Sequence, residues 1–393
     1  MTTIVNYLGK CPHCLQASVT SSIASTSSFC IAGEEDVGEP LLVMCNKCLS
    51  LSWRTEIEIT TEDVSDTDDW WTEGSVNKYK KVLKDNQVNG KKLTKTQKQH
   101  LEQLVSSRER WRRQDVLDDR AKGCLRGMEY ADIHGGTSSM ALLVFQSLIE
   151  NKNIGKDKID YDDIGRRYLE WYNNNAIDTG VVNAMVFDLV NEGVSFNEAS
   201  IQVDKKLHGM TASSRPACRA LPITVYLAGA INKNPDKWQY SGSAKIFENF
   251  IERETRLTHK HLHASQISKA VNMICMRLML DYSLDESIKA GGDYTTPKTR
   301  VNLGLTYKPI EITRKDLKNT GYADDALIAA IWFIRNTDSF EEAVKESIKL
   351  KGKSSYCSVL VGAIGGALYG YFDIENTVGK NSIFEYFHTE YLT

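Results

Sequence analysis

Four cysteines near the start of the chain have the spacing of a metal site. Cys11 and Cys14 form one C-x2-C pair, and Cys45 and Cys48 form a second pair after thirty intervening residues. Each pair can present two thiolates from a tight turn, and four thiolates complete the tetrahedral shell that Zn²⁺ prefers. Because protein ligands fill all four positions, none remains for an activated water molecule. We therefore predict one zinc ion with a structural role.

The remaining cysteines and the apolar segments indicate the compartment. The chain has nine cysteines, and an odd total with paired C-x-x-C spacing favours a metal site over a disulfide framework. The first residues lack a charged segment followed by an apolar one, so we expect no secretory signal. The longest apolar stretch, residues 359–372, is shorter than the ~20 residues that span a bilayer. We predict a cytoplasmic protein that does not enter a membrane.

Further along the chain, short polar motifs separate apolar helical segments. They lie at residues 127–135 (GMEYADIHG), 211–222 (TASSRPACRALP), 258–261 (THKH) and 321–327 (GYADDAL). Taken in order with the apolar segments 140–150 and 359–370, these motifs resemble the ADP-ribosylglycohydrolase family. The resemblance implies the family's all-α fold and a pocket for ADP-ribose.

The resemblance also implies a metal chemistry that this chain lacks the ligands to support. The family uses two Mg²⁺ ions, held by aspartates and a threonine, to bind the ribose and assist its cleavage. Hard cations need several anionic oxygens. Residues 135–139 (GGTSS) stand where the family has Thr-Asp-Asp-Thr, and residues 351–356 (KGKSSY) stand where it has Gly-Gly-Asp-x-Asp-Thr. Since a lysine in such a cluster repels Mg²⁺, we expect no Mg²⁺ to bind.

Eight residues stand where the resemblance places the family's pocket and are candidates for ligand binding. They are Asp132, Thr137, Ser138, Arg219, His259, Lys353, Ser355 and Tyr356. A structural reading stays open for three of them: Asp132 caps a helix, His259 is a satisfied helix-start histidine, and Arg219 holds a loop. No residue is singled out as catalytic.

The elements that must position these residues are mainly α-helical. Apolar residues at i, i+3 and i+4 recur from about residue 120 to 371, which predicts a large all-α domain over residues 120–393. After Leu51, apolar and polar residues alternate at period two, as in a strand. Residues 1–59 are therefore predicted to form a small β-rich zinc module. A charged linker, residues 60–119, joins the two, with one or two helices broken near Asn89-Gly90.

Three functions are compatible with this organisation. The favoured hypothesis is a catalytically degenerate ADP-ribosylglycohydrolase-like protein that acts by binding and is not an enzyme. Its ligand would be a protein partner, or ADP-ribose or a related nucleotide held near Lys353. The alternative is a metal-independent, rewired ADP-ribosyl hydrolase in which Asp132 is the acid or base and Lys353 or Arg219 stabilises charge.

The third hypothesis is a zinc protein associated with nucleic acid. The net charge of −3 gives no global reason for such a partner. Residues 77–113 are locally basic, either as a solvated helix that pairs with the acidic stretch 56–73 or as a docking face. Because the chain has no base-reading motif, nucleic acid is not favoured as a partner.

Overall fold

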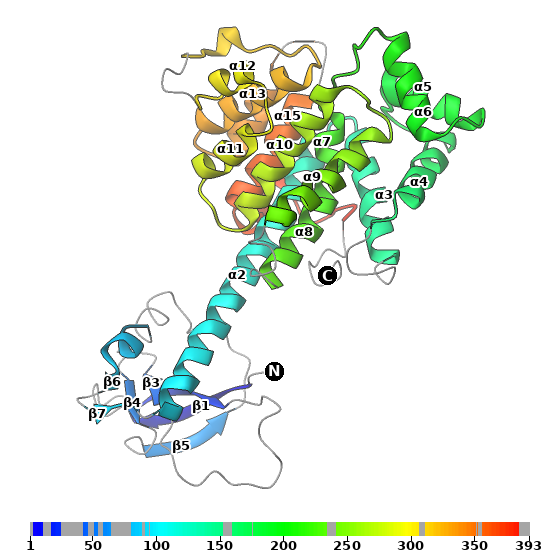
Figure 1. Ribbon diagram of the computed structural model, residues 1–393. Coiled ribbons are helices and arrows are strands. Elements are labelled where there is room, and N and C mark those ends of the chain that lie inside the picture. Colours follow the sequence, from blue (N-terminus) through cyan, green and yellow to red (C-terminus); the bar gives the residue numbers. More distant parts are fainter. Residues whose placement is uncertain are drawn as a thin grey trace. The chain divides into compact units, whose positions relative to one another are not determined.

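The computed structural model divides the chain into two compact units, residues 1–112 and 113–393. The structure describes residues 3–10, 17–24, 42–45, 51–53, 58–63, 80–88, 91–93, 95–151, 159–174, 176–233, 241–305, 311–350, 352 and 356–384. The finer predicted division at residues 59 and 119 stays a prediction. The fold as a whole is mainly helical, as the sequence predicts (Figure 1).

The first unit contains a five-stranded antiparallel sheet. Its strands are β1 (Thr3–Lys10), β2 (Ala17–Ala24), β3 (Leu42–Cys45), β4 (Leu51–Trp53) and β5 (Glu58–Asp63), in the order β4-β3-β2-β1-β5. This sheet agrees with the predicted β-rich module. Cys45 is the last residue of β3. The other three predicted ligands, Cys11, Cys14 and Cys48, lie outside the described residues. The zinc site therefore stays a prediction.

The predicted break in the basic segment is occupied by a short hairpin. Residues 80–85 are helical, and strands β6 (Gln87–Val88) and β7 (Lys91–Lys92) pair before α2 (Lys95–Ala131) begins. Asn89 and Gly90 lie between the two strands in sequence and outside the described residues. The helical residues 80–85 and α2 are thus separated at the predicted break.

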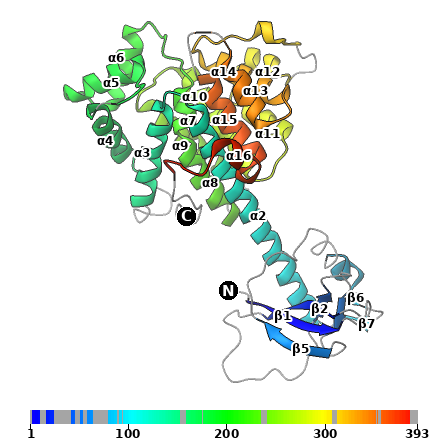
Figure 2. The ribbon, with the colours of Figure 1, turned by 180° about the vertical axis from the view of Figure 1, so that it is seen from behind.

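The second unit is built from helices. They are α3 (Gly136–Glu150), α4 (Tyr161–Asn173), α5 (Val181–Asn191), α6 (Phe196–Lys206), α7 (Arg215–Arg219), α8 (Leu221–Lys233), α9 (Ser241–Arg256), α10 (Leu262–Met279), α11 (Leu284–Gly292), α12 (Pro297–Asn302), α13 (Ala323–Arg335), α14 (Phe340–Ile348), α15 (Tyr356–Tyr369) and α16 (Tyr371–Val378). Both views show α10, α13 and α15 side by side (Figures 1 and 2). Among the described residues, no helix is both long and apolar enough to cross a bilayer.

Glycines bring α15 into direct backbone contact with the last turns of α2. A Cβ atom on Gly366 would lie 2.0 Å from the carbonyl oxygen of Gly123, and one on Gly362 would lie 2.1 Å from that of Gly127. On each helix the two glycines are four residues apart, so they share one face. The contact also includes a hydrogen bond from Ser358 Oγ to the carbonyl oxygen of Ala131, 3.2 Å away. It therefore positions Asp132, the residue that follows α2.

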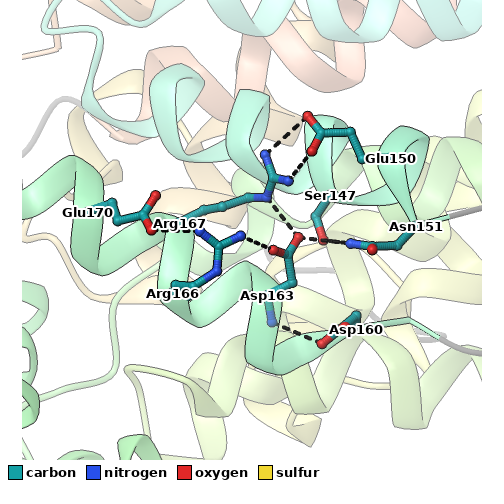
Figure 3. A network of polar contacts seen from close by, with 8 residues as sticks. All are labelled: Ser147, Glu150, Asn151, Asp160, Asp163, Arg166, Arg167 and Glu170. Atoms are coloured by element: carbon teal, nitrogen blue, oxygen red, sulfur yellow. Dashed lines mark hydrogen bonds and ion pairs between the residues drawn. The ribbon is translucent and has the colours of Figure 1, made fainter.

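An ion-pair network joins the end of α3 to the start of α4 (Figure 3). Asp163 accepts hydrogen bonds from Arg166, from Arg167 Nε at 2.7 Å and from Asn151 Nδ2 at 2.9 Å. Arg167 also pairs with Glu150 across the two helices. The network therefore ties together two helices whose sequence connection is longer than a tight turn.

We predict that Asp163→Asn lowers stability at neutral pH and not in acid. Burial alone would raise the pKa of Asp163, but hydrogen bonds from Ser147, Arg167 and Arg166 outweigh it and lower the pKa to about 2. A lowered carboxyl pKa stabilises the fold above the unfolded value near 4 and loses that effect as pH falls toward about 2. After allowance for solvent screening, the expected loss at pH 7 is about 1 kcal/mol.

Urea unfolding at neutral and acidic pH would measure this difference. Glu170→Gln is the matched control, because the Glu170 carboxylate is exposed and pairs with the equally exposed Arg166. The change should alter stability by less than about 0.5 kcal/mol. An Asp163→Asn loss that is equally large at both pH values would contradict the assignment.

Candidate functional site

The segment between α2 and α3 brings together three of the predicted pocket residues. Asp132 Oδ2 accepts hydrogen bonds from the backbone nitrogen of Ser138 at 2.7 Å and from its Oγ at 3.0 Å. Asp132, Ser138 and Thr137 are all buried. Gly135 precedes α3 and offers no side-chain cap, so the Asp132 carboxylate satisfies an N–H group that the helix leaves unpaired. Asp132 thus caps α3, the structural reading that the sequence left open.

The start of α3 packs directly on the loop before α5. A Cβ atom on Gly136 would lie 2.4 Å from the carbonyl oxygen of Asp178, so only glycine allows this approach. The Oγ1 atom of Thr137 is buried and has no hydrogen-bond partner among the described residues. Such an atom costs free energy unless a ligand or water molecule pairs with it.

Arg215, which the sequence analysis did not select, organises the neighbouring part of the site. Its Nη1 donates to the carbonyl oxygen of Asp178 at 2.6 Å, and its Nη2 donates to Asp178 Oδ2 at 2.9 Å. Its Nε and Nη2 donate to the hydroxyl of Tyr356 at 2.9 and 2.6 Å. Burial raises the pKa of Tyr356, so the tyrosine is a neutral hydroxyl at physiological pH. These contacts join α7, the loop before α5 and the first residue of α15.

Arg219 lies in the core and is not part of this group. Its side chain is 0% exposed, and its Nε donates to Glu254 Oε1, also 0% exposed, at 2.6 Å. Tyr168 donates to the same oxygen at 2.8 Å. Burial raises the pKa of Glu254, and the charge of Arg219 and the hydrogen bond from Tyr168 partly offset that effect. The pair joins α7 to the end of α9.

His259 is buried, and the charges of Arg219 and Arg215 act on its imidazole. Its Nδ1 lies 2.8 Å from Thr258 Oγ1. Burial, with the positive charges of Arg219 and Arg215, lowers the pKa of His259 well below its ordinary value. A neutral imidazole in this position can accept or donate a hydrogen bond, and it cannot supply a positive charge for an anionic ligand.

A second polar cluster lies at the starts of α10 and α13. His263 Nδ1 lies 3.0 Å from Asp324 Oδ2. Thr299 donates to Asp324 Oδ1, and the Tyr322 hydroxyl also contacts His263 Nδ1. His261 accepts a hydrogen bond from the backbone nitrogen of His263 and caps α10. The sequence motifs 258–261 and 321–327 include His261, Tyr322 and Asp324, but none of these residues, nor His263, was selected as a pocket residue.

The structure therefore places the predicted pocket residues in different environments. Asp132, Thr137, Ser138 and Tyr356 lie around the starts of α3 and α15, and the charge of Asp132 acts on Tyr356. Arg219 and His259 are buried behind them. Lys353 and Ser355 lie outside the described residues. The missed residues Arg215, Asp178 and His263 carried no local pattern, apart from the Ser-Arg-Pro order that is typical of a helix start.

The donor set does not fit a pair of Mg²⁺ ions. The first turns of α3 and α15 contain no acidic residue, and Asp132 is already committed to Ser138. Asp178 is paired with Arg215. Within the described residues, no three His, Cys, Asp or Glu side chains are grouped as metal ligands. Two hard cations would require more free carboxylate oxygens than this site offers.

Comparison with known proteins gives two relatives, each named ADP-ribosylarginine hydrolase Tri1. The protein from Serratia proteamaculans (strain 568) is 38% identical over 64 residues, which is 16% of this chain and 18% of that protein. The protein from Pseudomonas putida (strain GB-1) is 21% identical over 286 residues, which is 64% of this chain and 71% of that protein. The chain therefore spans less than a fifth of the Serratia protein that it matches.

A solved structure and a family model were also matched. The solved structure is described as an ADP-ribosylglycohydrolase-related protein complex. Its match to this chain has a TM-score of 0.47 and 20% sequence identity, and extends over 67% of this chain and 90% of the matched chain. The family model described as ADP-ribosylglycohydrolase matches residues 102–381, which is more than half of the chain. The resemblance seen in the sequence is thereby confirmed: the chain belongs to the ADP-ribosylglycohydrolase family.

Proposed function

We propose that the helical unit binds an ADP-ribose-type ligand and does not perform the magnesium-dependent hydrolysis of its family. The carrying observation is that the starts of α3 and α15 are both linked to Asp178, through Gly136 and through Arg215 with Tyr356, and that their first turns contain no carboxylate. Helix N-termini favour anions such as phosphate because their N–H groups and dipoles point outward. The same lack of carboxylates removes the ligands that Mg²⁺ would need.

Two further features support this ligand class. The relatives are named for ADP-ribosylarginine, which contains an ADP-ribosyl group. The chain also has Lys351 and Lys353 immediately before α15, where ammonium groups could pair with phosphate. The buried Thr137 hydroxyl, unpaired among the described residues, supplies a donor for a ligand oxygen.

Calorimetry with ADP-ribose tests the proposal through Thr137→Val. The variant should bind ADP-ribose about tenfold more weakly, because one hydrogen bond is lost. It should not unfold more easily, because the hydroxyl it removes has no protein partner. Thr255→Val is the matched control: its hydroxyl is equally buried and unpaired, but it lies in the core beside Glu254.

Magnesium separates binding from the hydrolysis of the family. ADP-ribose affinity should be the same in magnesium-free buffer and with excess magnesium, and ADP-ribosyl-arginine should not be cleaved in a magnesium-dependent way. Turnover that appears only when magnesium is added would overturn the proposal. Equal ADP-ribose affinity of wild type and Thr137→Val would contradict the proposed contact between the Thr137 hydroxyl and the ligand.

A protein partner is the second candidate, favoured by exposed apolar side chains next to the site. Ile133, Ile177, Val181, Met210 and Leu262 are more than half exposed and flank residues of the α2–α3 segment, α5, α7 and α10. Exposed apolar groups around a pocket suit contact with a polypeptide. If they contact the protein that carries the ADP-ribosyl group, an ADP-ribosylated peptide should bind more tightly than ADP-ribose in the same calorimetry.

We also propose that the N-terminal unit holds one structural zinc ion through Cys11, Cys14, Cys45 and Cys48. Elemental analysis of the purified protein should find about one zinc and no magnesium per chain. Cys48→Ser should lose the zinc, because three thiolates hold the ion more weakly than four. Cys30→Ser, at a single cysteine outside both pairs, should keep it. Equal zinc content in the two variants would contradict the assignment.

A further inference from the structure

The cluster at the starts of α10 and α13 has the arrangement of a histidine oriented by a carboxylate. Asp324 is 8% exposed and His263 is 29% exposed, with 3.0 Å between Oδ2 and Nδ1. Thr299 holds the other carboxylate oxygen. The Asp324 carboxylate is therefore buried and held on both oxygens, whereas the imidazole of His263 reaches solvent.

The partners of Nδ1 determine which ring nitrogen carries the proton. A carboxylate only accepts hydrogen bonds, so Nδ1 must carry the proton and donate it to Asp324. The Tyr322 hydroxyl oxygen can then share this donor. In the neutral ring Nε2 keeps a lone pair, and no partner for Nε2 is found in the described parts of the chain. The free nitrogen is thus the basic one.

Contacts of Tyr322 and Ala323 connect the His263 cluster to the segment that carries Arg215. The backbone nitrogen of Ala323 donates to the carbonyl oxygen of Ala212 at 2.9 Å, and Ser213 pairs with Tyr322 as an isolated β-bridge. Arg215 follows two residues later and contacts Tyr356 at the start of α15. Segment 212–215 therefore contacts both the His263 cluster and the proposed ligand site.

From this arrangement we infer that His263, oriented by Asp324, is a general base for metal-independent hydrolysis of an ADP-ribosyl group bound at the neighbouring site. The inference rests on the proposed ligand. His263 takes the role of base in place of Asp132, because Asp132 is buried and its Oδ2 accepts two hydrogen bonds from Ser138. Arg219, the other residue considered for a rewired reaction, is sealed in the core with Glu254.

The reaction step requires only the substrate and water. Nε2 of His263 takes a proton from a water molecule as the water oxygen forms a bond to the anomeric carbon of the ribose. The bond from that carbon to the guanidine nitrogen breaks, and its electron pair stays with the nitrogen. The imidazolium then returns the proton to this nitrogen, which releases arginine and ADP-ribose.

The test measures cleavage of ADP-ribosyl-arginine by the full-length protein in magnesium-free buffer. Slow turnover is expected, and His263→Gln should reduce it by about 10²-fold or more, which is the usual contribution of general-base catalysis. Asp324→Asn should also slow the reaction, because the amide no longer selects the Nδ1–H tautomer. His208→Asn is the control, since His208 is exposed and belongs to neither cluster.

Two further measurements keep the inference separate from folding and from ligand binding. His263→Gln should bind ADP-ribose as tightly as wild type, and free imidazole should restore part of the turnover of His263→Ala. If wild type binds ADP-ribose but does not cleave the substrate, or if His263→Gln cleaves it at the wild-type rate, the general base is wrong. If wild type does not bind ADP-ribose at all, the proposed ligand fails first.

Discussion

Arg219→Met is expected to destabilise the helical unit by about 3–5 kcal/mol, because it leaves a buried carboxylate without its partner. Arg219 and Glu254 are both 0% exposed, and among the described residues Tyr168 alone would remain as a side-chain donor to the carboxylate. Methionine fills most of the arginine volume, so the loss reports on charge more than on a cavity. Urea unfolding at neutral pH measures the effect.

The double variant Arg219→Met, Glu254→Gln is the control for this interpretation. Removing both charges should recover much of the lost stability, because no isolated charge is then buried. The single variant should also depend on pH. Burial already raises the pKa of Glu254, and without Arg219 the folded-state pKa rises further above the unfolded value. Its stability should therefore fall as pH rises between those two values. A loss that is independent of pH and of Glu254 would contradict the buried-charge explanation.

Gly362→Ala is expected to cost about 3 kcal/mol, at the upper end for overpacking in a core. The new Cβ would lie 2.1 Å from the carbonyl oxygen of Gly127 and 2.6 Å from the Cβ of Ala131. The Gly127 carbonyl and the Ala131 Cβ both belong to α2 and cannot rotate away, so the two helices must separate. Since Asp132 follows Ala131 directly, the change should also weaken ADP-ribose binding at the proposed site.

Gly365→Ala is the matched control on the same helix. Its Cβ would meet only the ring of Phe340 at 3.2 Å, and a ring can shift by the small amount required. Alanine also favours the helix by about 1 kcal/mol over glycine, so the net change should be small. Urea unfolding of both variants gives the comparison. Equal losses would mean that the backbone contact between α2 and α15 is not the source of the effect.

Local patterns in the chain were sufficient for the mainly helical fold and its family. Helical spacing of apolar residues depends on neighbours three and four positions away, so it can be read without knowledge of packing. The absence of carboxylates from residues 135–139 and 351–356 is likewise a matter of residue type alone. The zinc ligands and the loss of magnesium chemistry rest on the same kind of pattern and await the measurements above.

The pairing of polar side chains could not be obtained in this way. Arg219 and Arg215 are one helical turn apart in similar sequence, yet one is sealed against Glu254 and the other contacts Asp178 and Tyr356. Their partners lie 35, 37 and 141 residues away. Such distances are closed only when whole helices pack together, because the period of one helix does not specify which other helix covers each face.

Residue types by themselves thus determined that residues 135–139 and 351–356 contain no carboxylate, and folding cannot change a residue's type. Tertiary structure alone decided which of the remaining groups are available to a ligand. In the folded chain Arg219 is buried with Glu254, and Asp132 accepts a hydrogen bond from the first turn of α3. Asp324 contacts His263, which lies 61 residues away in the sequence. The reason is that a polar group's chemistry depends on its burial and its partners, and helix packing determines both.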